Sequence, residues 1–187
     1  HNAFLNEISA VIPIDAIKSI DELTCKLEHT DRNNPQDLAK KIKNRIRKNI
    51  GPYITCSIGF AANRLLAKMA SKINKPDGVT IWHPADMPTP ILTVDIEDVS
   101  GIGKNMQVRL QKAGIYTMLD LWKSQPKHLR NIWKNVVGER LWYAIHGYDI
   151  QAPTSGRNMF GHGRVLPPGS RKIEYARDCS RLLLVKA

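Results

Sequence analysis

The spacing of hydrophobic residues changes along the chain and predicts strands in some segments and helices in others. Residues 12–28 alternate with a period of two on each side of an acidic dipeptide, which predicts a β-hairpin. Residues 35–50 carry an apolar side chain at every fourth position from Leu38 onward, after an Asn34-Pro35 cap, and this predicts an amphipathic helix. A second amphipathic helix is expected over about 62–74.

Two short apolar runs predict buried strands around the second helix. The first run covers residues 53–58 and is expected to end at Gly59, and the second covers 79–82. With the hairpin and the two helices, these strands give the order ββαβαβ. This order predicts an α+β fold in which a sheet carries its helices on one face.

The pattern changes near residue 84, where three prolines mark a linker. Beyond it, the apolar spacing predicts a compact all-α domain of short helices over residues 94–99, 104–113, 117–123, 126–134 and 138–146. Residues 151–170 are rich in glycine and proline and predict a second linker, with a short strand at 158–166. Residues 171–187 begin a further helix.

Basic residues outnumber acidic ones and are segregated along the chain. There are 28 lysines and arginines against 17 acidic residues, a formal net charge of +11. Residues 32–75 hold 11 of the basic residues and one acidic residue, whereas residues 76–100 hold five acidic residues and no basic one. A strong positive charge steers a protein toward polyanions and makes binding depend on salt. The composition therefore favours a nucleic-acid partner.

Other features exclude several classes of protein. No apolar run reaches the ~18 residues of a membrane-spanning helix, and the first residues lack a signal-peptide pattern. We therefore expect a cytoplasmic protein with no membrane partner. Cys25, Cys56 and Cys179 are too few and too far apart for a disulfide framework, so we interpret them as reduced, buried thiols. The histidines show no metal-ligand spacing.

The stretch from Val99 to Lys104 is the most distinctive local motif. Gly101 and Gly103 flank Ile102, and a helix is expected to begin directly afterwards. Two glycines permit a tight turn and a close approach of a phosphate, and the N–H groups at the start of a helix attract anions. The motif is typical of one half of a helix-hairpin-helix that grips a nucleic-acid backbone. A plain glycine turn between two helices is the alternative.

Three motifs together resemble a known family. Ser19-Ile20-Asp21-Glu22 stands at the predicted hairpin tip, the segment from Cys56 to Gly78 follows, and Val99-Ser100-Gly101-Ile102-Gly103 comes last. In this order and at these separations, they resemble the Y-family translesion DNA polymerases of the ImpB/MucB/SamB type. The resemblance covers nearly the whole chain.

The resemblance implies a division into parts. Residues 1–91 would form the C-terminal part of the polymerase palm, 92–150 a helix-hairpin-helix thumb, and 151–187 a linker and the start of the little-finger domain. The family's first palm strand with its catalytic aspartate, its fingers and most of its little finger find no counterpart here. We therefore expect the chain to be a piece of a longer protein and to be inactive alone.

The resemblance also implies roles for individual residues. Asp21 would be a Mg²⁺ ligand, and Glu22 a ligand or a group that orients the nucleophile, in a two-metal site with one carboxylate missing from this chain. Lys75 would bind the triphosphate of the incoming nucleotide, and Gly101, Ile102, Gly103 and Lys104 would bind DNA. From the residues alone, a solvated acidic turn and an ordinary surface lysine stay open as alternatives. We interpret Arg64 and Lys68 as structural or distant electrostatic contributors.

The implied function is template-directed DNA synthesis across lesions. The implied partners are primer-template DNA, deoxynucleoside triphosphates and the replication sliding clamp. A non-catalytic DNA-binding or recruitment protein on the same fold is the alternative. An unrelated hairpin-type DNA-binding module is disfavoured, because it would need neither the acidic pair nor the turn at residues 74–78.

Overall fold

The computed structural model describes residues 1–150 and 165–186. The chain divides into two compact units, His1–Ile150 and Gln151–Ala187. The elements of the first half of the larger unit follow one another in this order: α1 (Asn2–Ser9), β1 (Ile14–Ile17), β2 (Leu23–Cys25), α2 (His29–Arg32), α3 (Pro35–Asn49), β3 (Ile58–Phe60), α4 (Arg64–Ile73) and β4 (Val79–Ile81). The predicted hairpin and both amphipathic helices are confirmed, whereas α1 was not predicted.

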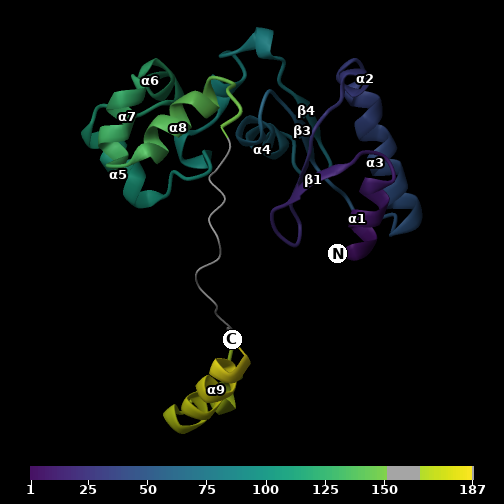
Figure 1. The fold of residues 1–187 in the computed structure, drawn as a ribbon, viewed down its shortest axis with the longest axis vertical. Helices are drawn as coiled ribbons and strands as arrows, with labels where there is room; N and C mark the ends of the chain where they lie inside the picture. Colours follow the sequence, from purple (N-terminus) through teal and green to yellow (C-terminus); the bar gives the residue numbers. More distant parts are fainter. Residues whose placement is uncertain (151–164, 187) are drawn as a thin grey trace. The chain divides into compact units, whose positions relative to one another are not determined.

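The strands form two separate pairs (Figure 1). β1 and β2 are antiparallel, with Ile17 opposite Leu23, and β3 and β4 are parallel, with Ile58 opposite Val79. The α+β class is confirmed. The strands do not join into the single sheet that the order ββαβαβ suggested.

Gly59 lies inside β3, so the prediction of a strand over 53–58 that ends at Gly59 was wrong. A Cβ atom at this position would lie 2.0 Å from the backbone oxygen of Ala67 and 2.4 Å from the backbone nitrogen of Ser71. Helix α4 therefore packs directly on the strand backbone, which only glycine permits. The glycine marks a close approach between two elements and not the end of a strand.

Helices lie on both faces of the β3–β4 pair. Phe60 is buried with residues of α3, and its neighbour Gly59 faces α4, as the alternation of a strand requires. Figure 1 shows α4 and α3 on opposite sides of the two strands. This arrangement differs from the expected sheet with helices on one face, because the second face is closed by α4.

The second half of the larger unit is helical, as predicted. Three short 3₁₀ turns (Pro84–Asp86, Ile91–Thr93 and Ile96–Asp98) lead into four helices, α5 (Lys104–Lys112), α6 (Met118–Lys123), α7 (Pro126–Trp133) and α8 (Val136–Ile145). The helix predicted over 94–99 is only one of these turns. Each of α5–α8 begins and ends within two residues of its prediction.

Two hydrophobic clusters form the core of this unit. One packs α3 against Ile12 and Phe60, with α1 at its edge. The other runs from Leu66 and Met69 of α4, through Trp82 and Ile91, to the buried faces of α5–α8. Asn63 adds polar contacts between the same parts. Its side-chain oxygen caps α4 by accepting from the Leu66 N–H, and its amide nitrogen donates to the carbonyls of Ala144 and Tyr148.

The smaller unit holds a short 3₁₀ turn, Pro168–Ser170, and helix α9 (Ile173–Lys186), so the helix predicted from residue 171 is confirmed. The strand predicted at 158–166 lies almost entirely outside the described residues. Across the described ranges, we find no helix with both the length and the apolar character needed to cross a membrane. The three cysteines are free thiols and only half-buried.

Candidate active site and nucleic-acid interface

The hairpin between β1 and β2 places Asp21 and Glu22 at its tip. The N–H groups of Lys18 and Ser19 both donate to the Glu22 carbonyl, at 2.8 and 3.1 Å, which closes the turn. The Ser19 hydroxyl donates to Oδ1 of Asp21 at 2.5 Å. This hydrogen bond, with smaller contributions from the charges of Lys75 and Lys68, lowers the pKa of the exposed Asp21 carboxyl. Asp21 is therefore ionised at neutral pH.

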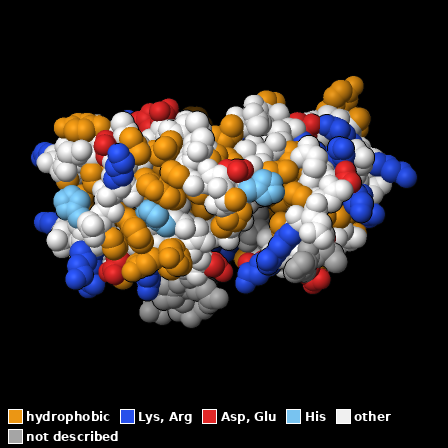
Figure 2. Space-filling view, turned by 90° about the horizontal axis from the view of Figure 1, so that it is seen from above, with side chains coloured by type: hydrophobic (Ala, Val, Ile, Leu, Met, Phe, Trp, Pro, Cys, Tyr) orange, Lys and Arg blue, Asp and Glu red, His pale blue; other side chains and the backbone are white. Residues whose placement is uncertain are grey.

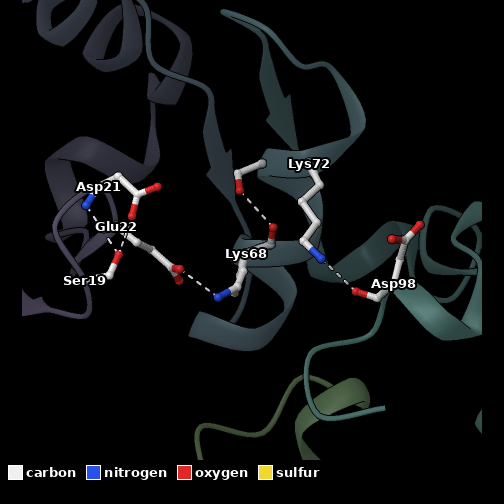
Figure 3. Close-up of polar contacts among 7 residues, drawn as sticks. Ser19, Asp21, Glu22, Lys68, Lys72 and Asp98 are labelled. Atoms are coloured by element: carbon white, nitrogen blue, oxygen red, sulfur yellow. Dashed lines mark hydrogen bonds and ion pairs between the residues drawn. The ribbon is translucent and has the colours of Figure 1, made fainter. Parts of the chain in front are cut away.

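Glu22 reaches toward helix α4 and pairs with Lys68 (Figure 3). The Lys68 Nζ donates to Oε2 of Glu22 at 2.7 Å, and both side chains are partly exposed. Lys68 therefore touches one of the two predicted catalytic carboxylates, which fits the structural contribution that we expected better than the distant electrostatic one. The two residues stand 46 positions apart, and no local pattern in the sequence signals their contact.

Lys72, one turn further along α4, points away from the hairpin and donates to the carbonyl of Asp98 at 3.0 Å (Figure 3). Lys75 is exposed in the turn after α4, and its charge acts on Asp21. The structure thus brings Lys68 into contact with Glu22 at the hairpin tip, and it places Lys75 in the turn that follows the same helix. Arg64 is the first residue of α4, and its role as a structural or distant electrostatic contributor stays a prediction.

The acidic pair suits a magnesium ion. Mg²⁺ prefers oxygen ligands and is commonly bound by one or two carboxylates together with the phosphates of its substrate. Asp21 and Glu22 supply two such carboxylates. Among the described residues, no cluster of three or more histidine, cysteine or acidic side chains is placed to hold a metal ion.

The two glycines of the turn before α5 differ in backbone conformation. Gly101 has φ of +100°, a left-handed conformation that favours glycine, whereas Gly103 has φ of −88° and precedes the first turn of α5. A Cβ atom on Gly103 would meet no atom within 4 Å. Gly101 is therefore required by the turn itself, whereas Gly103 leaves open space beside the first N–H groups of the helix.

Ile102 contributes to this turn from the inside. Its side chain is buried in the core, and its N–H donates to the Val99 carbonyl at 2.9 Å. The first N–H groups of a helix have no acceptor within the helix. Gly103 and Lys104 are thus the predicted DNA-binding residues that remain available to an anion.

Lysines and arginines gather at both ends of the face drawn in Figure 2. Four lysines and arginines of α3 form ion pairs: Lys40 with Asp37, Lys43 and Arg47 with Asp77, and Arg45 with Glu7. In α5–α8, only Arg130 is paired, with Glu139, within the part of the chain that the structure describes. The four lysines of α5–α8 are exposed, whereas Arg109 and Arg140 are half-buried.

Known proteins resemble this chain in both sequence and fold. Residues 1–72 match the model of the impB/mucB/samB family. The DNA polymerase IV of Moorella thermoacetica is 40% identical over 146 residues, which are 75% of this chain and 36% of that protein. The insertion ternary complex of Dbh DNA polymerase superposes with a TM-score of 0.67 at 25% identity, over 80% of this chain and 44% of that one.

The chain belongs to the Y family of DNA polymerases. A second relative of this family, the DNA polymerase IV of Alkaliphilus oremlandii, is 31% identical over 92% of this chain and 44% of its own length. The chain thus spans less than half the length of these curated Y-family relatives. The resemblance that the three motifs predicted is confirmed, and the roles of single residues stay predictions.

Proposed function

We propose that this chain supplies part of the palm and the thumb of a cytoplasmic DNA-directed DNA polymerase that acts in translesion synthesis. Residues 1–91 correspond to the palm part, 92–150 to the thumb, and 151–187 to a linker and the start of the little finger. Its partners are primer-template DNA and deoxynucleoside triphosphates, with the replication sliding clamp as a further partner. The observation that carries the proposal is the hairpin tip with Asp21 and Glu22, where Lys68 of α4 pairs with Glu22 and Lys75 stands in the turn directly after α4.

Each residue of this group has a chemical task. Asp21 and Glu22 would hold Mg²⁺, which when bound activates the attacking hydroxyl and neutralises the leaving pyrophosphate. Lys68 keeps the Glu22 carboxylate turned toward α4 by its ion pair. Lys75 provides a positive charge for the triphosphate.

The turn before α5 completes the substrate contacts. Backbone N–H groups at Gly103 and Lys104 would hold duplex phosphates, and phosphate contacts carry no sequence information. Such a grip suits an enzyme that works at any position of a template.

The test is a replacement in a relative of full length. Residues 1–150 of this chain take the place of the matching segment in the Moorella DNA polymerase IV, and primer extension is measured with Mg²⁺ and all four nucleotides. We expect template-directed extension by the chimera, with the unchanged relative as the positive control. A folded chimera that binds primer-template DNA without extending it would favour the non-catalytic DNA-binding alternative.

A further inference from the structure

The turn between α4 and β4 is held in place from a different helix. Lys43 and Arg47 stand one turn apart on α3, and both reach Asp77 in this turn. The Nζ of Lys43 lies 3.0 Å from Oδ1 of Asp77 and also donates to the Asp77 backbone carbonyl, and Arg47 donates to Oδ2. Lys43 is a buried cation, with only 8% of its surface exposed. Breaking a pair at a buried charge is costly, so this contact fixes the turn firmly.

The backbone of the turn is closely constrained as well. Asp77 has φ of 58°, in the left-handed region that few residues other than glycine adopt. A Cβ atom on Gly78 would lie 1.8 Å from the Asn74 carbonyl oxygen, so the chain doubles back on itself here. The Asn74 side chain donates to the Thr80 hydroxyl at 3.1 Å. The turn therefore has contacts to α3 on one side and to β4 on the other.

Lys75 projects from this turn two residues before Asp77. Its side chain is exposed, and the turn that carries it directly follows α4, the helix whose Lys68 pairs with Glu22 at the hairpin tip. An exposed lysine on a mobile turn would lose backbone freedom each time it bound an anion. Fixing the turn beforehand removes that loss, because the backbone that carries Lys75 is already in place.

We propose that Asp77, held by Lys43 and Arg47, is a positioning residue that presents Lys75 to the triphosphate of the incoming nucleotide. This inference rests on the proposed function, since it takes the triphosphate as the partner of Lys75. The proposal also explains why Lys43, the most buried cation of α3, points to the turn and is not available to DNA. Without it, Asp77 would be only a structural lock between α3 and β4.

The experiment is a titration of Mg²⁺–dATP into the 187-residue chain, followed by NMR. The variants are Lys75→Ala, Asp77→Asn, the double variant and Glu7→Gln. Glu7→Gln is the matched control, because it breaks another α3 ion pair, the 2.9 Å contact with Arg45, without touching the turn. Backbone ¹⁵N relaxation over residues 74–78 and thermal melting are recorded for each variant.

We expect Lys75→Ala to weaken binding roughly tenfold, as for the loss of one charge-assisted contact. Asp77→Asn should weaken binding about fivefold, because a freed turn must be ordered again on binding. It should also increase the mobility of residues 74–78. Asp77→Asn should add nothing in the Lys75→Ala background, and Glu7→Gln should bind like the parent.

Three outcomes would overturn the proposal. If Asp77→Asn binds like the parent, the turn needs no anchor. If its loss persists in the Lys75→Ala background, Asp77 acts on the fold in general, although Lys75 keeps its role. If Lys75→Ala binds like the parent, Lys75 does not bind the triphosphate, and the positioning role proposed for Asp77 is then wrong as well. Should Asp77→Asn fail to fold, Arg47→Gln removes one exposed contact to Asp77 and is tested in the same cycle.

Discussion

Helix α3 and the four helices α5–α8 are both rich in lysine and arginine, yet they use these residues differently. In α3, four cations pair with carboxylates from α1, from the turn at Asp77 and from α3 itself. In α5–α8, the described cations are unpaired apart from Arg130. Helix α3 therefore uses most of its cations for contacts within the fold, whereas most cations of α5–α8 are available to a polyanion. Net charge along a sequence does not by itself locate a nucleic-acid surface.

The largest expected effect is the loss of primer extension when the predicted metal ligand Asp21 in the first half of the chain is replaced. Asp21→Ala in the chimera with the Moorella enzyme should lower primer extension by more than ~100-fold, beyond the loss that a merely supporting residue causes. Affinity for primer-template DNA should stay nearly unchanged, because an acidic side chain adds no attraction for the phosphates that dominate DNA binding. Extension and DNA binding are measured on the same preparation. A variant with near-normal turnover would place the catalytic carboxylates elsewhere.

Substitution of Gly103 tests the α5–α8 half of the comparison. The ordinary φ of Gly103 and the open space around it show that the fold can accept a side chain here. Gly103→Val should therefore melt like the parent and bind duplex DNA roughly tenfold more weakly, since the side chain keeps a phosphate from the N–H groups. Binding is measured by fluorescence anisotropy. Parent-like affinity would reduce the motif to a structural turn.

Removing one positive charge from α5 and one from α3 should change the salt dependence of DNA binding differently. Lys104→Ala should reduce the slope of log affinity against log salt by about 1 unit, as for one lost phosphate contact. Arg45→Gln removes one charge from α3 and should leave the slope unchanged, because Arg45 is already paired with Glu7. Titrations with one duplex at several salt concentrations give both slopes. An equal drop for Arg45→Gln would mean that α3 also contacts DNA.

The smallest expected effect is a change in thermal stability when Asp120, which caps the start of α6, is replaced. Asp120 accepts from the N–H groups of Tyr116 and Thr117 at the start of α6, and these hydrogen bonds lower the pKa of its carboxyl. A lowered pKa in the folded state stabilises the fold above the ordinary value of 3.8, and the gain is lost as pH falls through the folded pKa. Asp120→Ala should therefore melt below the parent at pH 7, and the difference between the two melting temperatures should shrink as the pH falls below 3.8.

Local patterns predicted the elements of the fold well. The period of two around Asp21 gave the hairpin, and the apolar spacing beyond residue 100 gave α5–α8 nearly to the residue. Helix α1 was not predicted, since the residue before it, His1, makes no side-chain cap and no acidic residue stands in its first turn. The prediction at Gly59 was wrong because a glycine is needed there to let the backbone of α4 pack against the strand, and this contact involves residues several positions later.

The candidate site was predictable only in part. The motifs pointed to Asp21, Glu22 and Lys75, but not to the partners that hold them. Lys68 meets Glu22 across 46 positions, and Lys43 meets Asp77 across 34. Such pairs arise from how α3, α4 and the strands pack together, and a periodicity read along one element carries no information about them.

Asn63 has a consequence for how the larger unit moves and unfolds. Its amide bonds to the carbonyls of Ala144 and Tyr148 tie the start of α4 to the end of α8, beside a hydrophobic core that the same elements share. The segment between them, residues 83–95, is therefore no free hinge. A swing of α5–α8 away from α4 would release both hydrogen bonds and open the shared core, so residues 1–150 should melt in a single cooperative transition.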